Sequence, residues 1–259
     1  EDLYESIKKN NLTKVLVTCF TSKFVIFVFQ QSEMIFSNAV IVISTEQYSK
    51  FSLLQCTIHS VWVKEHSSTL DTRQRYALSD CYDTYPKPEN ELKLENIGRE
   101  YYQLRSNIMI STNIGLTALY NSFHSPKEKT ADIVLLRELH VEMDNAVAAA
   151  YGWSDLDLGH GFHETPQGVR FTISEAARRE VLSRLLQLNH ERYEEEVRQG
   201  LHEKDKKKAK EEQPARQKPK RLAKLEGQLN LLAEPEVPVA VETAEALPPT
   251  PTSEIGGWD

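Results

Sequence analysis

The hydrophobic period of the chain changes near residue 89, and this change restricts the fold to the α+β class. Before it, β-branched and aromatic runs between Lys14 and Ser44 are separated by polar turns, which predicts a small, mostly antiparallel sheet. The run KFVIFVF (residues 23–29) is apolar almost throughout, so we expect it to be a central strand. The runs EMIFS and AVIVIS predict further strands. After residue 89 the apolar residues recur at helical spacing, which predicts a helical bundle.

A single packing helix is expected to cover the sheet. Thr45 is a suitable N-cap, and apolar residues follow at three-to-four spacing as far as Glu65. The run RQRYALSD (residues 73–80) then predicts a returning strand, and Pro86 and Pro88 end this part of the chain.

Three later segments show amphipathic helical seams. Their apolar positions are Leu94, Ile97, Tyr101, Leu104 and Ile108; then Ile133, Leu136, His140, Met143 and Val147; then Val181, Leu182, Leu185, Leu186 and Tyr193. We therefore predict a sheet domain at residues 1–88 and a helical module at 89–202. Residues 203–259 are rich in Lys, Glu, Pro and Ala with few aromatics, so we expect a disordered charged tail. Its basic residues are compatible either with weak nonspecific DNA affinity or with a solubilising role.

The composition restricts the cellular compartment and the kinds of partner that we expect for this chain. The 40% hydrophobic content is sufficient for a core, and no apolar run approaches the roughly 18 residues of a membrane span. The three cysteines, Cys19, Cys56 and Cys81, are widely spaced, which favours free buried thiols in a reducing cytoplasm. The net charge of −7 does not exclude DNA binding, because phosphate contacts depend on local rather than net charge.

The stretch from His59 to Pro88 resembles the C-terminal recognition segment of large single-chain adenine-N6 DNA methyltransferases, many of them type IIG restriction–modification enzymes. In that family the stretch reads roughly H-x-x-W…S-S…R-Y-x-x-S-D-C-F-x-x-F-P-x-P. The matching residues here are His59, Trp62, Ser67, Ser68, Arg75, Tyr76, Ser79, Asp80, Cys81, Pro86 and Pro88. Tyr82 and Tyr85 replace the usual Phe residues. Blocks at 115–126, 131–162 and 168–197 extend the resemblance, which runs from about residue 13 to residue 200.

The resemblance implies a bacterial or archaeal parent protein that methylates adenine in double-stranded DNA with S-adenosylmethionine. The chain contains no Asn-Pro-Pro-Tyr/Phe tetrapeptide and no Gly-x-Gly motif that follows a strand and opens a helix, so we predict no catalytic residue, metal or cofactor site within it. The methyltransferase domain, and any nuclease, is expected upstream in the same polypeptide, and whether this chain belongs to an enzyme rests on that domain. The alternative is a protein-interaction module whose helical seams bind another subunit without direct DNA contact.

A polar cluster between the expected helix and strand is the candidate DNA contact. The candidate residues are Lys14, Lys23, Lys64, His66, Ser67, Ser68, Arg73 and Arg75. Arginine suits phosphates and guanine edges, so Arg73 and Lys64 are the preferred contacts. Arg75 is expected to be structural, in an ion pair with Asp80 or Asp83. The alternative for the whole cluster is a solvated loop that contains this ion pair.

Other chemistry-bearing residues favour structural roles. His160, His163 and Glu164 lack the spacing of a metalloprotease motif, and a Gly-rich turn is the preferred interpretation. Cys81 has no evident basic neighbour to activate it, so we predict a buried thiol. His140, on an apolar seam, is predicted to be a hydrogen-bonded core histidine, and the aromatic residues Trp62, Trp153, Tyr82 and Tyr85 are assigned to core packing rather than base stacking.

Overall fold

A computed structural model describes residues 3–70 and 73–201 and shows the predicted α+β fold, with small antiparallel sheets and a predominance of helix. The expected disordered tail lies outside the described residues. The expected boundary at residue 88 falls inside one compact unit that spans Glu1–Glu203, so the sheet and the helical module share a core. Among the described residues, no helix is both long and apolar enough to cross a membrane.

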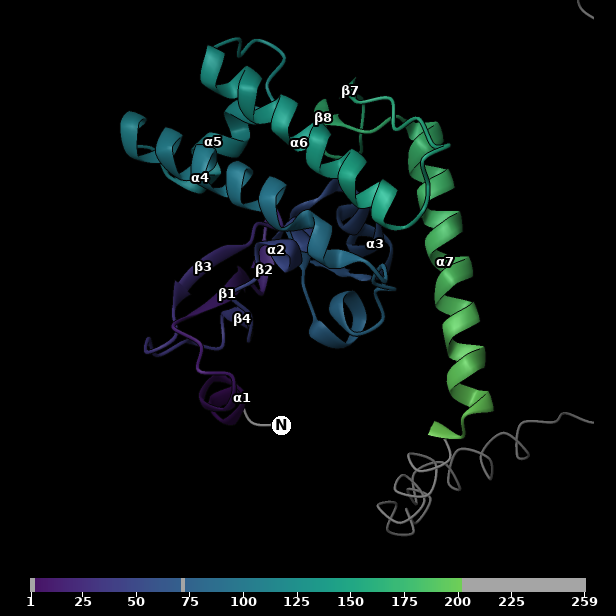
Figure 1. Cartoon of the computed structure of the whole chain (residues 1–259). Coiled ribbons are helices and arrows are strands. Elements are labelled where there is room, and N and C mark those ends of the chain that lie inside the picture. The colour runs from purple at the N-terminus through teal and green to yellow at the C-terminus, as the bar shows by residue number, and fades with distance from the viewer. Residues whose placement is uncertain (1–2, 71–72, 202–259) are drawn as a thin grey trace, which may run out of the picture. The chain divides into compact units, whose positions relative to one another are not determined.

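The main sheet has three antiparallel strands in the order β3-β1-β4, after a short helix α1 (Leu3–Lys9). The strands are β1 (Lys14–Cys19), β3 (Val28–Gln31) and β4 (Val40–Ile43). Leu16 is fully buried in β1 and pairs with Phe29 on one side and Ile43 on the other. Figure 1 shows the sheet at one end of the unit, with α2 beside it and α4, α5 and α6 beyond.

The prediction that residues 23–29 form the central strand is wrong, since β1 is central and only Val28 and Phe29 of the run enter a strand. The segment before them is held by side chains instead of by a ladder. The Phe27 backbone N–H donates to Gln55 Oε1 at 2.9 Å, and Arg105 Nη2 donates to the Phe27 carbonyl at 2.7 Å. With both backbone groups satisfied, Phe27 is fully buried outside the sheet. Residues 33–37, also expected as a strand, form a turn and loop in which Ile35 is 92% exposed.

The predicted helix from Thr45 to Glu65 is two helices, α2 (Tyr48–Gln55) and α3 (Thr57–His66). Cys56 separates them with extended backbone torsions, φ −67° and ψ 162°, and its Sγ accepts the His59 N–H. The Thr57 N–H at the start of α3 donates to Asp144 Oδ1 at 2.7 Å, so a distant carboxylate stabilises the new helix N-terminus.

A second small sheet, in the order β2-β6-β5, carries three of the candidate DNA-binding residues, Ser68, Arg73 and Arg75. Its strands are β2 (Thr21–Ser22), β5 (Ser68–Leu70) and β6 (Arg73–Arg75). The predicted strand at residues 73–80 therefore ends early, and a π-helical turn (Leu78–Tyr82) follows it. The Asp83 N–H closes this turn by donating to the Leu78 carbonyl at 2.9 Å, and the turn places Cys81 in the core.

The helical module follows the predicted seams. Its elements are a 3₁₀ turn (Glu91–Leu94), α4 (Glu95–Thr112), α5 (Leu116–Phe123), α6 (Ala131–Ala150), β7 (Gly161–His163), β8 (Arg170–Thr172) and α7 (Glu175–Arg198). The seams of α4 and α6 are largely buried, whereas α7 buries only its first half, and Leu186 and Tyr193 are exposed. Ser174 caps α7 by accepting the Ala177 N–H at 3.1 Å.

Arg105 provides a test of the side-chain support beneath Phe27. Arg105→Met removes the donor to the Phe27 carbonyl and leaves buried acceptors unpaired, so the free energy of unfolding should fall by about 3 kcal/mol. Arg99→Met is the control, because Arg99 makes an exposed pair with Glu95, and its loss should cost under about 1 kcal/mol. Urea denaturation measures both; equal costs would contradict the role given to Arg105.

Buried neutral histidines should make the fold sensitive to mild acid. Burial lowers the pKa of His59 to about 4 and that of His124 to about 3, and it also lowers the pKa of His140. The unfolded chain therefore binds protons more tightly, so their stabilisation is complete above about pH 6.5 and is lost as the pH falls towards 4. Urea midpoints measured across this range should fall, with proton uptake on unfolding. The exposed His190 provides a control, since His190→Gln should leave the pH dependence unchanged; a flat stability profile for the wild-type chain would refute the prediction.

Candidate nucleic-acid interface

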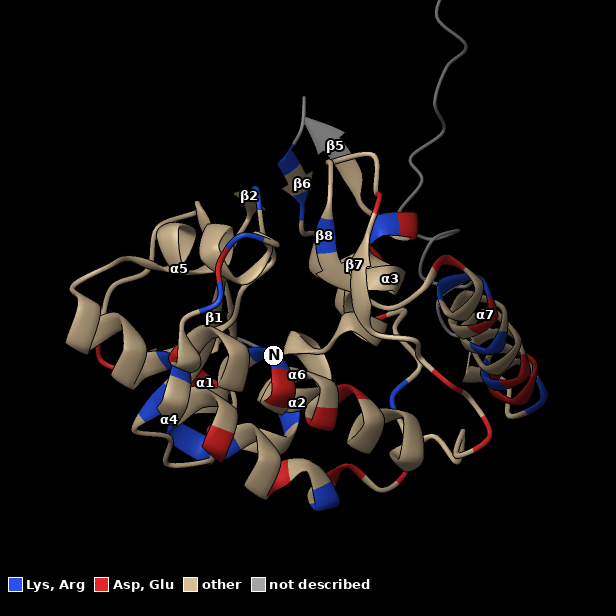
Figure 2. Cartoon of the chain, turned by 90° about the horizontal axis from the view of Figure 1, so that it is seen from above, with Lys and Arg blue, Asp and Glu red and all other residues tan. Residues whose placement is uncertain are grey.

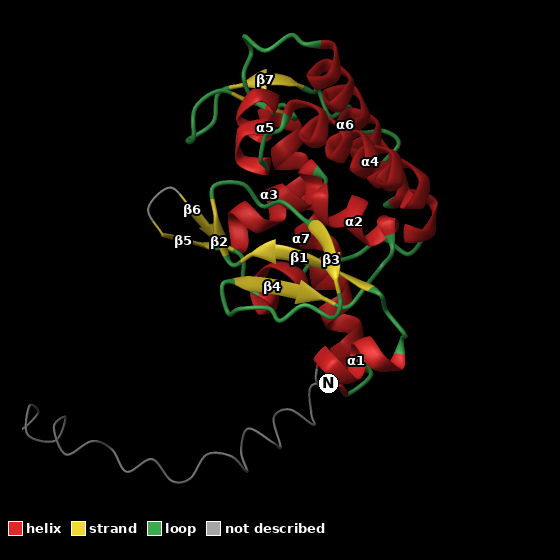
Figure 3. Cartoon of the chain, turned by 90° about the vertical axis from the view of Figure 1, so that its left-hand side faces the viewer, coloured by secondary structure: helices red, strands yellow, loops and turns green. Residues whose placement is uncertain are grey.

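The ribbon formed by β5 and β6 presents two arginines on one face. Leu70 pairs with Arg73, and Ser68 pairs with Arg75. Arg73 and Arg75 are exposed, whereas Gln74 between them is only 8% exposed, as the two-residue period of a strand requires. Figure 2 shows β5, β6 and β2 together at one edge, and Figure 3 shows the hairpin extending from the body of the unit. A two-stranded ribbon of this type has the dimensions that the major groove of DNA admits.

Arg75 does not form the expected ion pair. Among the ion pairs of the described residues, none joins Arg75 to Asp80 or Asp83, and the Asp80 carboxylate instead accepts the Ser79 hydroxyl at 2.7 Å. The Arg75 guanidinium lies 4.9 Å from the centre of the Phe20 ring. This contact orients the side chain without neutralising its charge.

The opposite face of β6 borders a cavity of about 90 Å³ that contains other candidate residues. We call it the basic pocket and define it by its Lys, Arg and His residues: Lys23, Lys64, His124, His140 and Arg170. Gln74 also lines it, and no Asp or Glu is among the described residues that do. Sequence reasoning had placed Lys64 and Arg73 on one surface, but strand alternation puts Arg73 outside this pocket.

Like charges act on one another in the basic pocket. Lys64 is exposed along part of its side chain, yet burial of its ammonium group and the positive charges of Arg178 and Arg170 lower its pKa to about 8. Burial, followed by Arg170, His140 and Lys64, lowers the pKa of His124. Lys23 Nζ donates a hydrogen bond to the uncharged amide oxygen Asn121 Oδ1 at 2.9 Å, which leaves the lysine charge uncompensated. The pocket is therefore a concentration of positive charge without a compensating carboxylate in its lining.

The remaining predicted residues do not join the pocket. Lys14 starts β1, where its ammonium lies 4.3 Å from the ring centres of both Phe29 and Tyr48, a structural cation–π contact. His66 stacks on Trp62, with ring centres 3.7 Å apart, and its Nδ1 contacts the Trp62 carbonyl at 3.0 Å.

Ser67 and Ser68 take part in the structure through their backbone groups. Ser67 is the C-cap of α3, and its backbone N–H donates to the Val63 carbonyl at 2.8 Å. Ser68 begins β5 and pairs with Arg75 in the ribbon.

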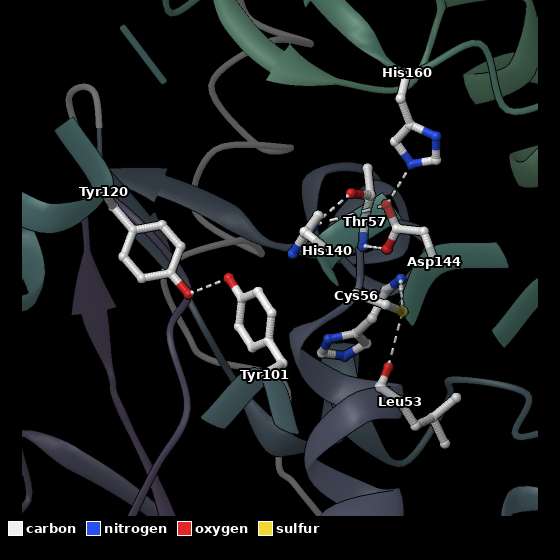
Figure 4. A network of polar contacts seen from close by, with 9 residues as sticks. Leu53, Cys56, Thr57, Tyr101, Tyr120, His140, Asp144 and His160 are labelled. Carbon is white, nitrogen blue, oxygen red and sulfur yellow. Dashed lines mark hydrogen bonds and ion pairs between the residues drawn. The ribbon is translucent and has the colours of Figure 1, made fainter. Parts of the chain in front are cut away.

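A polar network next to the pocket holds His140 and His160 of the helical module in place by hydrogen bonds (Figure 4). His140 Nε2 lies 3.0 Å from Thr57 Oγ1, which confirms the hydrogen-bonded core histidine, and His160 Nε2 lies 2.8 Å from Asp144 Oδ2. His163 instead contacts the Gly159 carbonyl at 2.9 Å. Over residues 3–70 and 73–201, no group of three His, Cys, Asp or Glu residues is placed to hold a metal ion.

The cysteines and aromatics mainly serve packing. Cys81 is buried, and burial raises the pKa of its thiol, as expected for a structural cysteine. Trp62 and Tyr85 are buried in the core. Cys19, expected to be buried with the other two, is exposed.

Sequence reasoning missed Arg170, His124 and Gln74. Arg170 lies in the block at residues 168–197 that extends the family resemblance, and its position between the apolar residues Val169 and Phe171 was the available clue. Nothing local indicates that β8 packs near α3, since that contact joins segments about a hundred residues apart.

Comparison with known proteins finds similarity in the first part of the chain. Residues 3–89 match the model of the MmeI target recognition domain, which confirms the resemblance read from the sequence for this part of the chain. Over 120 residues the chain is 28% identical to DNA methyltransferase A of Bacillus subtilis (strain 168), covering 46% of this chain and 13% of that protein.

The fold also resembles a solved structure. The type IIL restriction–modification enzyme MmeI, determined in complex with DNA, aligns with a TM-score of 0.51 and 24% identity. The alignment covers 69% of this chain and 21% of the MmeI chain. The chain thus spans only a small part of the length of either relative.

The positive charges near Lys64 predict that its pKa is lowered, which can be measured by titration. NMR of labelled lysine side chains should give Lys64 a pKa near 8, well below the ordinary value of 10.5. Arg170→Gln removes one of the nearby positive charges and should raise this pKa. Arg179→Gln is the matched control, because Arg179 is exposed and paired with Glu175. If Lys64 titrates near 10.5 in the wild-type chain, the inferred charge crowding is wrong.

Proposed function

We propose that this chain is the DNA-binding, target-recognition portion of a restriction–modification DNA methyltransferase. The observation that carries the proposal is the β5–β6 ribbon, which presents Arg73 and Arg75 side by side within the segment that matches a target recognition domain. Arginine can contact a guanine edge or a phosphate with two parallel hydrogen bonds. The DNA complex of MmeI supports double-stranded DNA as the ligand.

For the parent protein we propose S-adenosylmethionine-dependent adenine-N6 methylation at a defined site, in a bacterial cytoplasm. The similarity to DNA methyltransferase A supports methyl transfer. Because this chain contains no Asn-Pro-Pro motif, we assign the cofactor and the reacting base to a methyltransferase domain upstream in the same polypeptide. The role of this chain is then to dock on the duplex and to contribute to sequence readout.

The ribbon can be tested by duplex binding at several salt concentrations. Arg73→Gln and Arg75→Gln should weaken binding without unfolding the chain, because both side chains are exposed. A lost phosphate contact should reduce the salt slope by about one unit on every sequence. A lost base contact should cost about 1–3 kcal/mol on the cognate site only. Arg99→Gln, on the exposed surface of α4, is the control.

Two results would count against this proposal. If neither ribbon variant changes affinity, salt slope or site preference, the ribbon does not contact DNA. If the wild-type chain also fails to bind duplex DNA, the interaction-module alternative becomes the better account.

A further inference from the structure

The basic pocket has no role in the recognition ribbon as proposed. Arg73 and Arg75 face outward from β6, whereas Gln74 faces the pocket. Lys64 comes from α3 in the recognition segment, and Arg170 comes from β8 in the helical module. The pocket is therefore built jointly by both parts of the chain, since Gln74 of β6 and Arg170 of β8 both line it.

Several buried nitrogen atoms of the pocket lack a protein partner. The Nδ1 atoms of His140 and His124 and the Nε atom of Arg170 are buried without a hydrogen bond among the described residues. The Arg170 Nε–H is a donor, and His140, only 7% exposed, presents an Nδ1–H donor in the tautomer whose Nε2 accepts the Thr57 hydroxyl. Unpaired buried donors are costly, and a ligand acceptor would offset that cost.

The charge of the pocket specifies the ligand chemistry. Arg178, which adds to the local positive charge, is paired with Glu175 at 2.7 Å, but Lys64 and Arg170 form no ion pair among the described residues. Arg170 lies over the Phe24 ring at 5.5 Å, which fixes its guanidinium without neutralising it. The Asp144 carboxylate lies 3.7 Å from His140 Nε2 but is not part of the pocket lining. Lys64 and Arg170 without an ion-pair partner, together with the unpaired Arg170 Nε–H, therefore point to an anion site.

We propose that the basic pocket binds a backbone phosphate of the DNA duplex, so that the helical module and the recognition segment hold the same strand of DNA. This inference rests on the proposed function. The cavity of about 90 Å³ is small compared with the roughly 300 Å³ of a typical pocket for a drug-sized ligand, which favours a single phosphate group over a whole nucleotide. A DNA phosphate is favoured over free phosphate because Gln74, which lines the pocket, lies between Arg73 and Arg75 in the same short strand.

Duplex binding by the 259-residue chain tests the proposal, with fluorescence anisotropy between about 50 and 200 mM salt. Lys64→Gln and Arg170→Gln should each weaken binding about three- to tenfold at the higher salt concentration, on all sequences alike. The double variant should reduce the salt slope by about one unit, because both residues serve one phosphate. Arg170→Lys should restore part of the affinity. Lys127→Gln, an exposed lysine of the helical module outside the pocket, should have no effect.

A second arm separates the two sources of phosphate. Titration with inorganic phosphate, followed by the NMR signals of His124 and His140, reports occupation of the pocket directly. Perturbation by phosphate that competes with duplex supports the proposal. Perturbation by phosphate while Lys64→Gln and Arg170→Gln bind duplex normally would overturn it in favour of a free-phosphate site.

The remaining outcomes distinguish the pocket from the ribbon. Normal duplex binding by the folded pocket variants, together with impaired binding by Arg73→Gln and Arg75→Gln, would overturn the pocket and leave the proposed function intact. Normal binding by all four variants would overturn both. Urea denaturation of each variant verifies that it is folded.

Discussion

The buried carboxylate of Asp144 is the contact on which the placement of the recognition segment depends. Its Oδ1 accepts the Thr57 N–H at the start of α3, and its Oδ2 accepts from His160. Burial opposes the charged form, but His140, His160 and the Thr57 N–H outweigh it and keep the pKa of this carboxyl below its ordinary value. A carboxylate fully removed from water is tolerated only with such donors around it, so α6 fixes the N-terminus of α3. The other end of α3 carries Lys64 and leads directly into the ribbon.

The elements that the sequence predicted are those whose hydrophobic period is local. Strands β1 and β4 were expected because each is a β-branched run between polar turns, and the long helices α4, α6 and α7 were expected because three-to-four spacing is complete within each segment. Residues 23–29 were misread because an apolar run has no period that distinguishes a strand from an irregular core segment. What decides the conformation there is the pair of hydrogen bonds from Gln55 and Arg105, which come from elsewhere in the chain. The break at Cys56 has the same origin, since the apolar spacing continues across it while Asp144, 87 residues after Thr57, caps the second helix.

The candidate interface was predictable in its chemistry and not in its geometry. The cluster from Lys64 to Arg75 was identified because arginines and lysines gather between a helix and a strand. The expected Arg75 ion pair is not found among the described residues: the Asp80 carboxylate accepts the Ser79 hydroxyl, and the Arg75 guanidinium lies over the Phe20 ring. Arg170 could not be assigned from its own surroundings, because its neighbours in the pocket come from a segment about a hundred residues earlier.

The strict alternation along β6 has an evolutionary consequence. Because neighbouring side chains of a strand face opposite ways, residues 73 and 75 can be exchanged without altering the wall that residue 74 contributes to the cavity. A substitution and a one-residue insertion or deletion therefore have different effects. Replacing an outward-facing residue changes one surface of the strand only. Inserting or deleting a single residue shifts the register, so that every following side chain of the strand moves to the other face. We therefore expect related sequences to differ in β6 by substitutions and not by insertions or deletions. Differences in length should be confined to the connection between β5 and β6.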